Sequence, residues 1–141
     1  MVNLFFEDTE VLDYDPEFFV LWLSKVVAAH EKQLGELNLI FCSDEYLLEM
    51  NREHLQHDYY TDIITFDYCV GEFISGDLFI SIDRVKENAT IQNEMFHVEL
   101  CRVVVHGVLH LVGYKDKSDT DEREMRRQEA LALDLLVPRE T

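Results

Sequence analysis

Apolar residues recur along the chain in two patterns: short strand-like runs, and longer stretches with a helical period. The short runs are rich in β-branched and aromatic residues, which favour strands, and they predict strands at 2–6, 37–42, 63–68 and 78–82. The longer stretches predict helices at about 17–34, 43–55, 83–88, 93–112 and from 118 onward. Because strands cluster early and helices late, the sequence predicts an α+β fold.

Capping and breaking residues mark the ends of these predicted helices. Asp, Ser and Pro favour helix starts, whereas Gly favours helix ends. The expected starts are at Asp13 or Asp15 with Pro16, and at Ser43, Asp83 and Ser118; the expected ends are at Gly35 and Gly113, with Pro138 closing the fold.

The length of 141 residues predicts one domain, 1–141, with one core. The N-terminus lacks the basic and apolar regions of a secretory signal, and no apolar run approaches the ~20 residues that span a bilayer, so we expect a cytoplasmic protein without a membrane partner. Cys42, Cys69 and Cys101 are odd in number and far apart, which argues against a disulfide framework and favours three buried thiols.

Charge argues against a nucleic-acid partner. Twenty-nine acidic and twelve basic residues give a formal net charge of −17, which repels nucleic acid at long range. Binding would then need a local basic patch, a bound cation or another protein. One basic cluster follows position 114, but five acidic residues interleave with it, so a solvated helical face explains it equally well. Its members are Lys115, Lys117, Arg123, Arg126 and Arg127.

The stretch 100–112 is apolar nearly all round and carries His106 and His110 four residues apart, hence on one face of a buried helix. Each could be an ordinary core histidine with its own hydrogen-bond partner. Gly113 and Asp116 complete the spacing H-x-x-x-H-x-x-G-x-x-D, which is the metzincin pattern apart from its last ligand. We therefore predict a divalent metal ion, zinc, on His106, His110 and Asp116, with one position open for water.

Position 107 separates this pattern from the metallopeptidases, whose general base is a glutamate directly after the first histidine. Here that position is Gly107, so a protease mechanism lacks its base. A glycine costs a helix roughly 1 kcal/mol relative to alanine. Its presence indicates either close approach of a neighbouring backbone or a substrate, or tight helix packing.

The segment His106–Tyr114 resembles the signature of the YbeY family, bacterial metal-dependent endoribonucleases linked to ribosomal RNA maturation. The segments 61–66 and 76–81 resemble two further family strands, and Asn51, Met125 and Glu129 also match. The resemblance implies a small mixed sheet of about four strands flanked by helices, with a zincin-like metal helix in the centre. It also implies hydrolysis of phosphodiesters in single-stranded RNA.

Two positions depart from the family. Its third ligand is usually histidine, whereas this chain has Asp116, a competent zinc ligand whose hard oxygen also suits manganese or magnesium. Its arginine four residues after Asn51 is replaced by Leu55. Another cation must then stabilise developing charge, or turnover is weak; Lys115 and Arg102 are the candidates for that catalytic role.

The expected nucleophile is a metal-bound water, or a 2′-hydroxyl that it deprotonates. Lys117, Tyr59 and Arg52 are candidate RNA-binding residues, although solvated or rim positions explain them as well. The expected partners are ribosomal RNA in small-subunit precursors and a ribosome-associated protein. Two other functions stay open: a weakly catalytic or non-catalytic ribosome assembly factor with a structural metal, and a metallohydrolase acting on another substrate.

Overall fold

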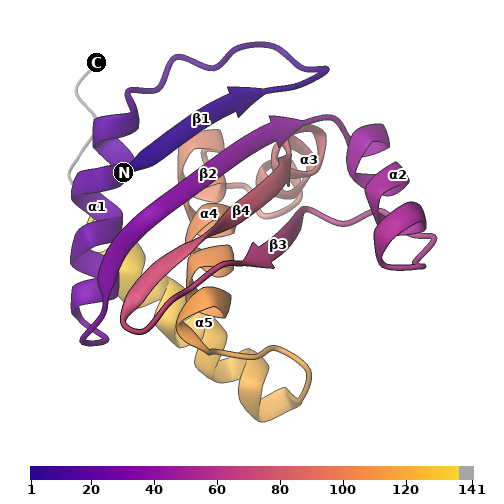
Figure 1. Ribbon diagram of the computed structural model, residues 1–141. Coiled ribbons are helices and arrows are strands. Elements are labelled where there is room, and N and C mark those ends of the chain that lie inside the picture. The colour runs from indigo at the N-terminus through magenta and orange to yellow at the C-terminus, as the bar shows by residue number, and fades with distance from the viewer. Residues whose placement is uncertain (137–141) are drawn as a thin grey trace.

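The computed structural model describes residues 1–136, which form one four-stranded sheet and five helices (Figure 1). In chain order these elements are β1 (Val2–Phe6), α1 (Pro16–Ala28), β2 (Gln33–Cys42), α2 (Asp44–His54), β3 (Ile63–Asp67), β4 (Phe73–Ser81), α3 (Ile82–Ile91), α4 (Phe96–Val112) and α5 (Asp119–Leu133). The predictions of an α+β class and a sheet of about four strands are confirmed.

The sheet is mixed, with the strand order β1-β2-β4-β3. β1, β2 and β4 are parallel, whereas β3 runs antiparallel to β4 and pairs Ile63 with Ile80 at one end and Asp67 with Gly76 at the other. β3 is thus an edge strand whose second side is free of strand partners within the described residues.

Alternate residues of β2 and β4 face the main core, as the period of two in a strand requires. Leu37, Leu39 and Phe41 of β2 are fully buried there, together with Leu78 and Ile80 of β4. α1 packs on β1 and β2, α4 packs on β3 and β4, and α5 packs on α4. In Figure 1, α4 passes behind the sheet, and ten of its 17 residues are buried.

The first helix ends earlier than predicted. α1 stops at Ala28 instead of near position 34, and Glu31 takes a left-handed conformation (φ 60°) that turns the chain into β2. Leu34 and Gly35 belong to β2, which begins at Gln33 opposite Phe73. Leu34 continues the helical period of α1, so the pattern alone assigned it wrongly; pairing with β4 outweighs that local preference.

Five other boundaries also differ. β4 begins at Phe73 because it pairs with the early part of β2, and Ile82, predicted in that strand, is the first residue of α3. Ser81 caps α3, not Asp83, and α3 extends to Ile91 instead of 88. β3 ends one residue early, at Asp67. α4 begins at Phe96 instead of near 93.

Three of the predicted helix caps and the predicted helix stop at Gly113 are confirmed. Asp15, Ser43 and Ser118 cap α1, α2 and α5 as predicted, and Gly113 ends α4. The predicted stop at Pro138 lies outside the described residues.

Cys42 and Cys101 are buried as expected, but Cys69 is only partly buried because it follows β3 in a loop. Within residues 1–136 no single helix is long and apolar enough to cross a membrane, although α3 and α4 together, bent by 118°, meet that test by length and composition.

Candidate metal centre

α4 presents His106 and His110 on one face, because residues four apart lie one above the other along a helix. The rings meet edge to face with centroids 4.6 Å apart, and their Nε2 atoms are separated by 3.0 Å. Both side chains are partly exposed, at 23% and 27%. The pair therefore lies at the surface of an otherwise buried helix.

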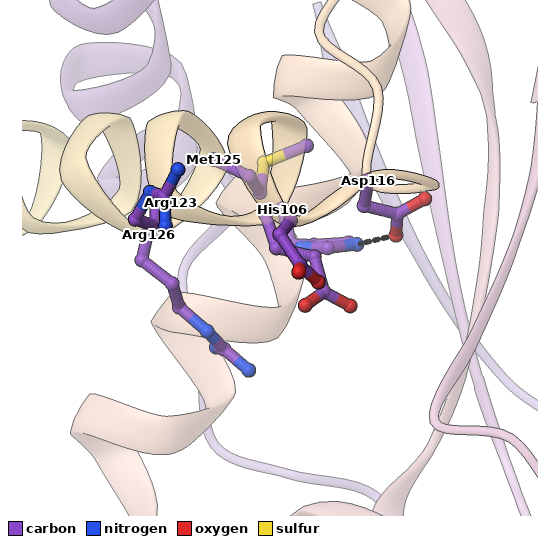
Figure 2. A pocket seen from close by; sticks show the side chains of 7 residues that line it. His106, Asp116, Arg123, Met125 and Arg126 are labelled. Atoms are coloured by element: carbon purple, nitrogen blue, oxygen red, sulfur yellow. Dashed lines mark ion pairs between the residues drawn. The ribbon is translucent and has the colours of Figure 1, made fainter.

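Asp116 joins the pair because α4 ends at Gly113. This glycine has φ 127°, a conformation that a side chain disfavours, and its N–H bonds the carbonyls of Leu109 and His110. The chain turns back, and Oδ2 of Asp116 lies 3.3 Å from Nε2 of both histidines. Figure 2 marks the contact between His106 and Asp116. We call His106, His110 and Asp116 the tripod.

Hydrogen bonds on the far side of each ring determine which nitrogen faces the tripod. Nδ1 of His110 lies 2.9 Å from the carbonyl oxygen of Tyr114, which only accepts, so Nδ1 carries the proton. Nδ1 of His106 lies 2.7 Å from a carboxylate oxygen of Glu129, which favours the same tautomer. In the neutral rings both Nε2 atoms then present lone pairs to each other and to Asp116.

Three acceptors facing one another repel unless a cation lies between them. Ligand atoms at about 2.0–2.1 Å from a tetrahedral zinc ion stand roughly 3.3 Å apart, and the tripod atoms are separated by 3.0–3.3 Å. The donor set and its spacing therefore fit a divalent ion, and these three residues form a group that can hold a metal.

Carboxylates around His106 raise the pKa of its ring. Burial by itself lowers the pKa of His106, but the hydrogen bond to Glu129 and the charges of Glu129, Asp62 and Asp116 outweigh it and raise that pKa. Glu129 is only 2% exposed, and its second oxygen accepts a 3.2 Å bond from Arg126. His106 is thus hydrogen-bonded to a buried carboxylate, as the ligating histidines of metal sites commonly are.

Two clefts open on the tripod, and both are lined by His106 and Asp116. The first, about 680 Å³, runs along the edge strand β3 and is lined by Ile63, Thr65 and residues of the loop before β3. We call it the strand cleft. The second, about 690 Å³, lies against α5, and we call it the helix cleft. Figure 2 shows the helix cleft, with His106 between Asp116 on one side and Arg123 and Arg126 on the other.

The candidates for catalysis and RNA binding are scattered. Lys117 and Tyr59 line the strand cleft, as does Leu55 in place of the family's arginine. Lys115 is exposed and is not among the residues lining either cleft. Arg102 is partly exposed, pairs with the buried Glu99 at 2.5 Å and lines neither cleft.

Arg52, the last of these candidates, bonds Asp58 at 2.6 Å on the surface. It lies on α2, one residue after Asn51. Arg52 does not line either cleft. Its proposed role in RNA binding therefore has no structural support beyond its place on the helix that precedes the strand cleft.

Three polar residues near the site were not given roles from the sequence. Glu129 is hydrogen-bonded to His106, and its match to the family was the signal in the sequence that pointed to it. Asp62 lines the strand cleft, where burial raises its pKa against the attraction of His106. Asn51 is 2% exposed, and its side-chain amide donates to the carbonyl of Tyr59, so it holds the loop that forms the wall of the strand cleft.

Tight packing explains Gly107, one of the two readings of that position. A Cβ there would lie 2.7 Å from Cδ1 of Ile63 and 3.1 Å from both terminal methyls of Leu78. α4 therefore approaches β3 and β4 too closely for a larger residue to fit without movement.

Fold and site together define a class: a single-sheet α+β protein with a group of three residues that could hold a metal ion, open to two clefts. The family model described as endoribonuclease YbeY matches residues 7–136. Proteins named endoribonuclease YbeY from Flavobacterium johnsoniae and Bacteroides thetaiotaomicron are 52% and 53% identical, over 92% and 79% of this chain and 92% and 82% of their own. The chain belongs to the YbeY family.

A solved structure agrees with this assignment. The solution structure of a protein from Thermotoga maritima is similar with a TM-score of 0.66 and 26% identity, covering 96% of this chain and 89% of that one. The similarity extends over nearly the whole fold, which supports the arrangement of the sheet and helices described above. The zincin-like character of the metal helix stays a prediction.

Proposed function

We propose that this protein is a metal-dependent endoribonuclease that hydrolyses phosphodiester bonds in single-stranded RNA. The observation that carries the proposal is the tripod itself: three lone-pair donors 3.0–3.3 Å apart at the meeting of two clefts, in a member of the endoribonuclease YbeY family. We further propose ribosomal RNA in small-subunit precursors as the substrate, and therefore the cytoplasm as the location.

Each side chain has a distinct task in this proposal. His106, His110 and Asp116 hold a divalent ion, for which we propose zinc, with manganese or magnesium as the alternatives that a carboxylate ligand permits. Such an ion lowers the pKa of water and polarises a phosphoryl oxygen. Glu129 and the Tyr114 carbonyl accept from the two Nδ1 atoms, so that in the neutral rings each Nε2 presents its lone pair to the ion. Tyr59, stacked on His57 with ring centroids 5.1 Å apart, offers a flat surface to a base in the strand cleft.

A second function, a weakly catalytic ribosome assembly factor with a structural metal, is favoured by Leu55. This side chain is 41% exposed in the strand cleft and brings no charge to a phosphate. On that reading a ribosome-associated protein recruits the chain, which compensates for its charge of −17. A peptidase is disfavoured, because Gly107 supplies no general base.

Metal content and RNA cleavage test the proposal in sequence. The purified wild type should hold about one zinc per chain, and His110→Ala and Asp116→Ala should lose it. His97→Ala is the matched control, since His97 is also partly buried and hydrogen-bonded, to Tyr14, but lies near the start of α4, nine residues before His106. The loaded wild type should then cut single-stranded RNA and spare duplex.

Each outcome separates the candidates. Zinc retained in Asp116→Ala would remove the third ligand from the site. A loaded wild type that cuts no RNA, while variants without metal still support ribosome maturation, would favour the assembly factor.

A further inference from the structure

The missing positive charge near the tripod raises a question that the proposed function leaves open. Leu55 lines the strand cleft beside both histidines, where the family resemblance predicts an arginine. A phosphodiester that reaches the tripod also meets Asp62, Asp67 and Asp116 along that cleft. Some cation of this chain must offset these charges if RNA is to bind, and the inference below rests on the proposed function in that respect.

Only three cationic side chains line the two clefts within residues 1–136. Lys117 lines the strand cleft, and Arg123 and Arg126 line the helix cleft. They therefore line two different clefts, which meet at His106 and Asp116. A strand that passes over the tripod would leave one cleft and enter the other.

The basic residues of α5 differ in what they already bind. Arg126 donates to Glu129, and Arg127 bonds Glu124 at 3.0 Å and does not line the helix cleft. Arg123 lines that cleft and forms no ion pair with any described residue. Its guanidinium is exposed and available to a ligand.

The helical period explains this division. Positions 122, 123 and 126 lie three, four and seven residues after position 119, so the four form one stripe along α5. All four line the helix cleft. Met125, Glu129 and Ala132 form the buried side of the same helix. Arg127 lies four residues after Arg123, but it is turned almost directly away from the buried side of α5 and does not line the cleft.

We propose that Arg123 binds a backbone phosphate of the RNA on the helix-cleft side of the tripod, and so supplies the charge that Leu55 cannot. A guanidinium donates two parallel N–H···O hydrogen bonds to a phosphate, and it keeps its charge at any physiological pH. Lys117 contacts the RNA in the strand cleft. Arg123 is thus a substrate-positioning residue and takes no part in bond breaking.

Asp119 and Glu122 line the same cleft and oppose this contact. Their charges weaken the attraction of Arg123 for a phosphate, which makes the inference testable in both directions. Loss of Arg123 should weaken RNA binding, and neutralisation of Glu122 should strengthen it. The second effect also follows from the direct repulsion between Glu122 and a phosphate, so the role of Arg123 is tested by the loss in Arg123→Ala and its partial recovery in Arg123→Lys.

The experiment compares Arg123→Ala, Arg123→Lys and Glu122→Gln with the wild type, and Arg127→Ala is the matched control. Steady-state cleavage of a short single-stranded RNA by the zinc-loaded proteins yields KM and kcat, and fluorescence anisotropy of the metal-free proteins yields Kd over a series of salt concentrations. Equal zinc content and equal circular dichroism across the set exclude damage to the tripod or the fold.

We expect Arg123→Ala to raise KM and Kd about tenfold with little change in kcat, and to reduce the salt slope of log Kd by about 0.7. Arg123→Lys should recover part of the loss, Glu122→Gln should lower KM, and Arg127→Ala should match the wild type. An unchanged KM in Arg123→Ala, or an equal rise in Arg127→Ala, overturns the inference while the proposed function stands. A zinc-loaded wild type that cuts no RNA overturns the proposed function itself, and this inference with it.

Discussion

Glu129 accepts a 2.7 Å hydrogen bond from Nδ1 of His106, although the two residues are 23 positions apart and belong to different helices. The bond ties α5 to the outer face of α4 and leaves Nε2 of His106 directed at Asp116 and His110. Glu129 is 2% exposed, so this carboxylate has little water to solvate it and depends on His106 and Arg126.

Loss of the charge on Glu129 should therefore weaken metal binding. Glu129→Gln keeps an acceptor for His106 but removes the anion, and we expect about 10- to 100-fold lower zinc affinity, measured by competition with a chelator. Glu124→Gln, on the same helix but paired with Arg127, should bind zinc as the wild type does. Equal affinity in the two variants would mean that Glu129 only packs.

Gly107→Ala should destabilise the fold because of its neighbours. Alanine gains roughly 1 kcal/mol of helix propensity, but overpacking against Ile63 and Leu78 costs about 1–3 kcal/mol. We expect a net loss of about 1 kcal/mol in the free energy of unfolding, measured by urea denaturation.

Ile63→Val removes the Cδ1 atom that lies 2.7 Å from the new Cβ, so the double variant should be more stable than the sum of the two single changes. Strict additivity would show that Ile63 moves aside freely.

Cys42 should resist alkylation in the native protein. Burial first, and then the charges of Asp8, Glu7, Asp83 and Asp44, raise the pKa of its thiol to about 12, so almost no thiolate exists at pH 8.5. The folded state holds this proton more tightly than the unfolded state does. The resulting stability is therefore complete below the ordinary thiol pKa of about 9 and is lost as pH rises towards 12.

Iodoacetamide labelling at pH 8.5, read by mass spectrometry, checks this expectation. Cys69, which is only partly buried, should be modified before Cys42, and urea should make the two equal. Modification of Cys42 at the rate of Cys69 in the native protein would contradict it.

Asp44 should stabilise the fold above acidic pH. It accepts bonds from Arg84 at 2.9 Å and from the hydroxyl of Ser81 at 2.7 Å, which join the start of α2 to α3. Burial alone raises its pKa, but the bonds from Arg84 and Ser81 outweigh that effect and lower it. A lowered pKa means that this stability is present above the unfolded-state pKa and is lost as pH falls through the folded one.

Asp44→Asn should accordingly lose about 1–3 kcal/mol of unfolding free energy at pH 7, and the difference from the wild type should shrink in acid. Asp58→Asn, which affects an exposed pair with Arg52, should change stability much less, because solvent screens that pair. A difference for Asp44→Asn that is constant with pH would exclude the ion pair as its cause.

Local rules in the sequence were sufficient for part of this molecule. The four-residue spacing of His106 and His110, the helix stop at Gly113 and the caps at Asp15, Ser43 and Ser118 depend on neighbours within one or two turns, and the structure has them as predicted. The same rules placed Asp116 near the histidines, because a left-handed glycine reverses the chain within a few residues. Metal binding by the three remains a prediction.

Tertiary structure decided the rest, because it depends on segments far apart in the chain. Pairing with β4 drew Leu34 and Gly35 out of the predicted helix and into β2, and the approach of Ile63 and Leu78 explains the glycine at 107. The packing of α5 on α4 placed Glu129 behind His106 and separated Arg123 from Arg127, although both belong to one basic cluster in the sequence. Residue spacing determines which side chains share a helix face, but only the packing of that helix determines which face meets the cleft.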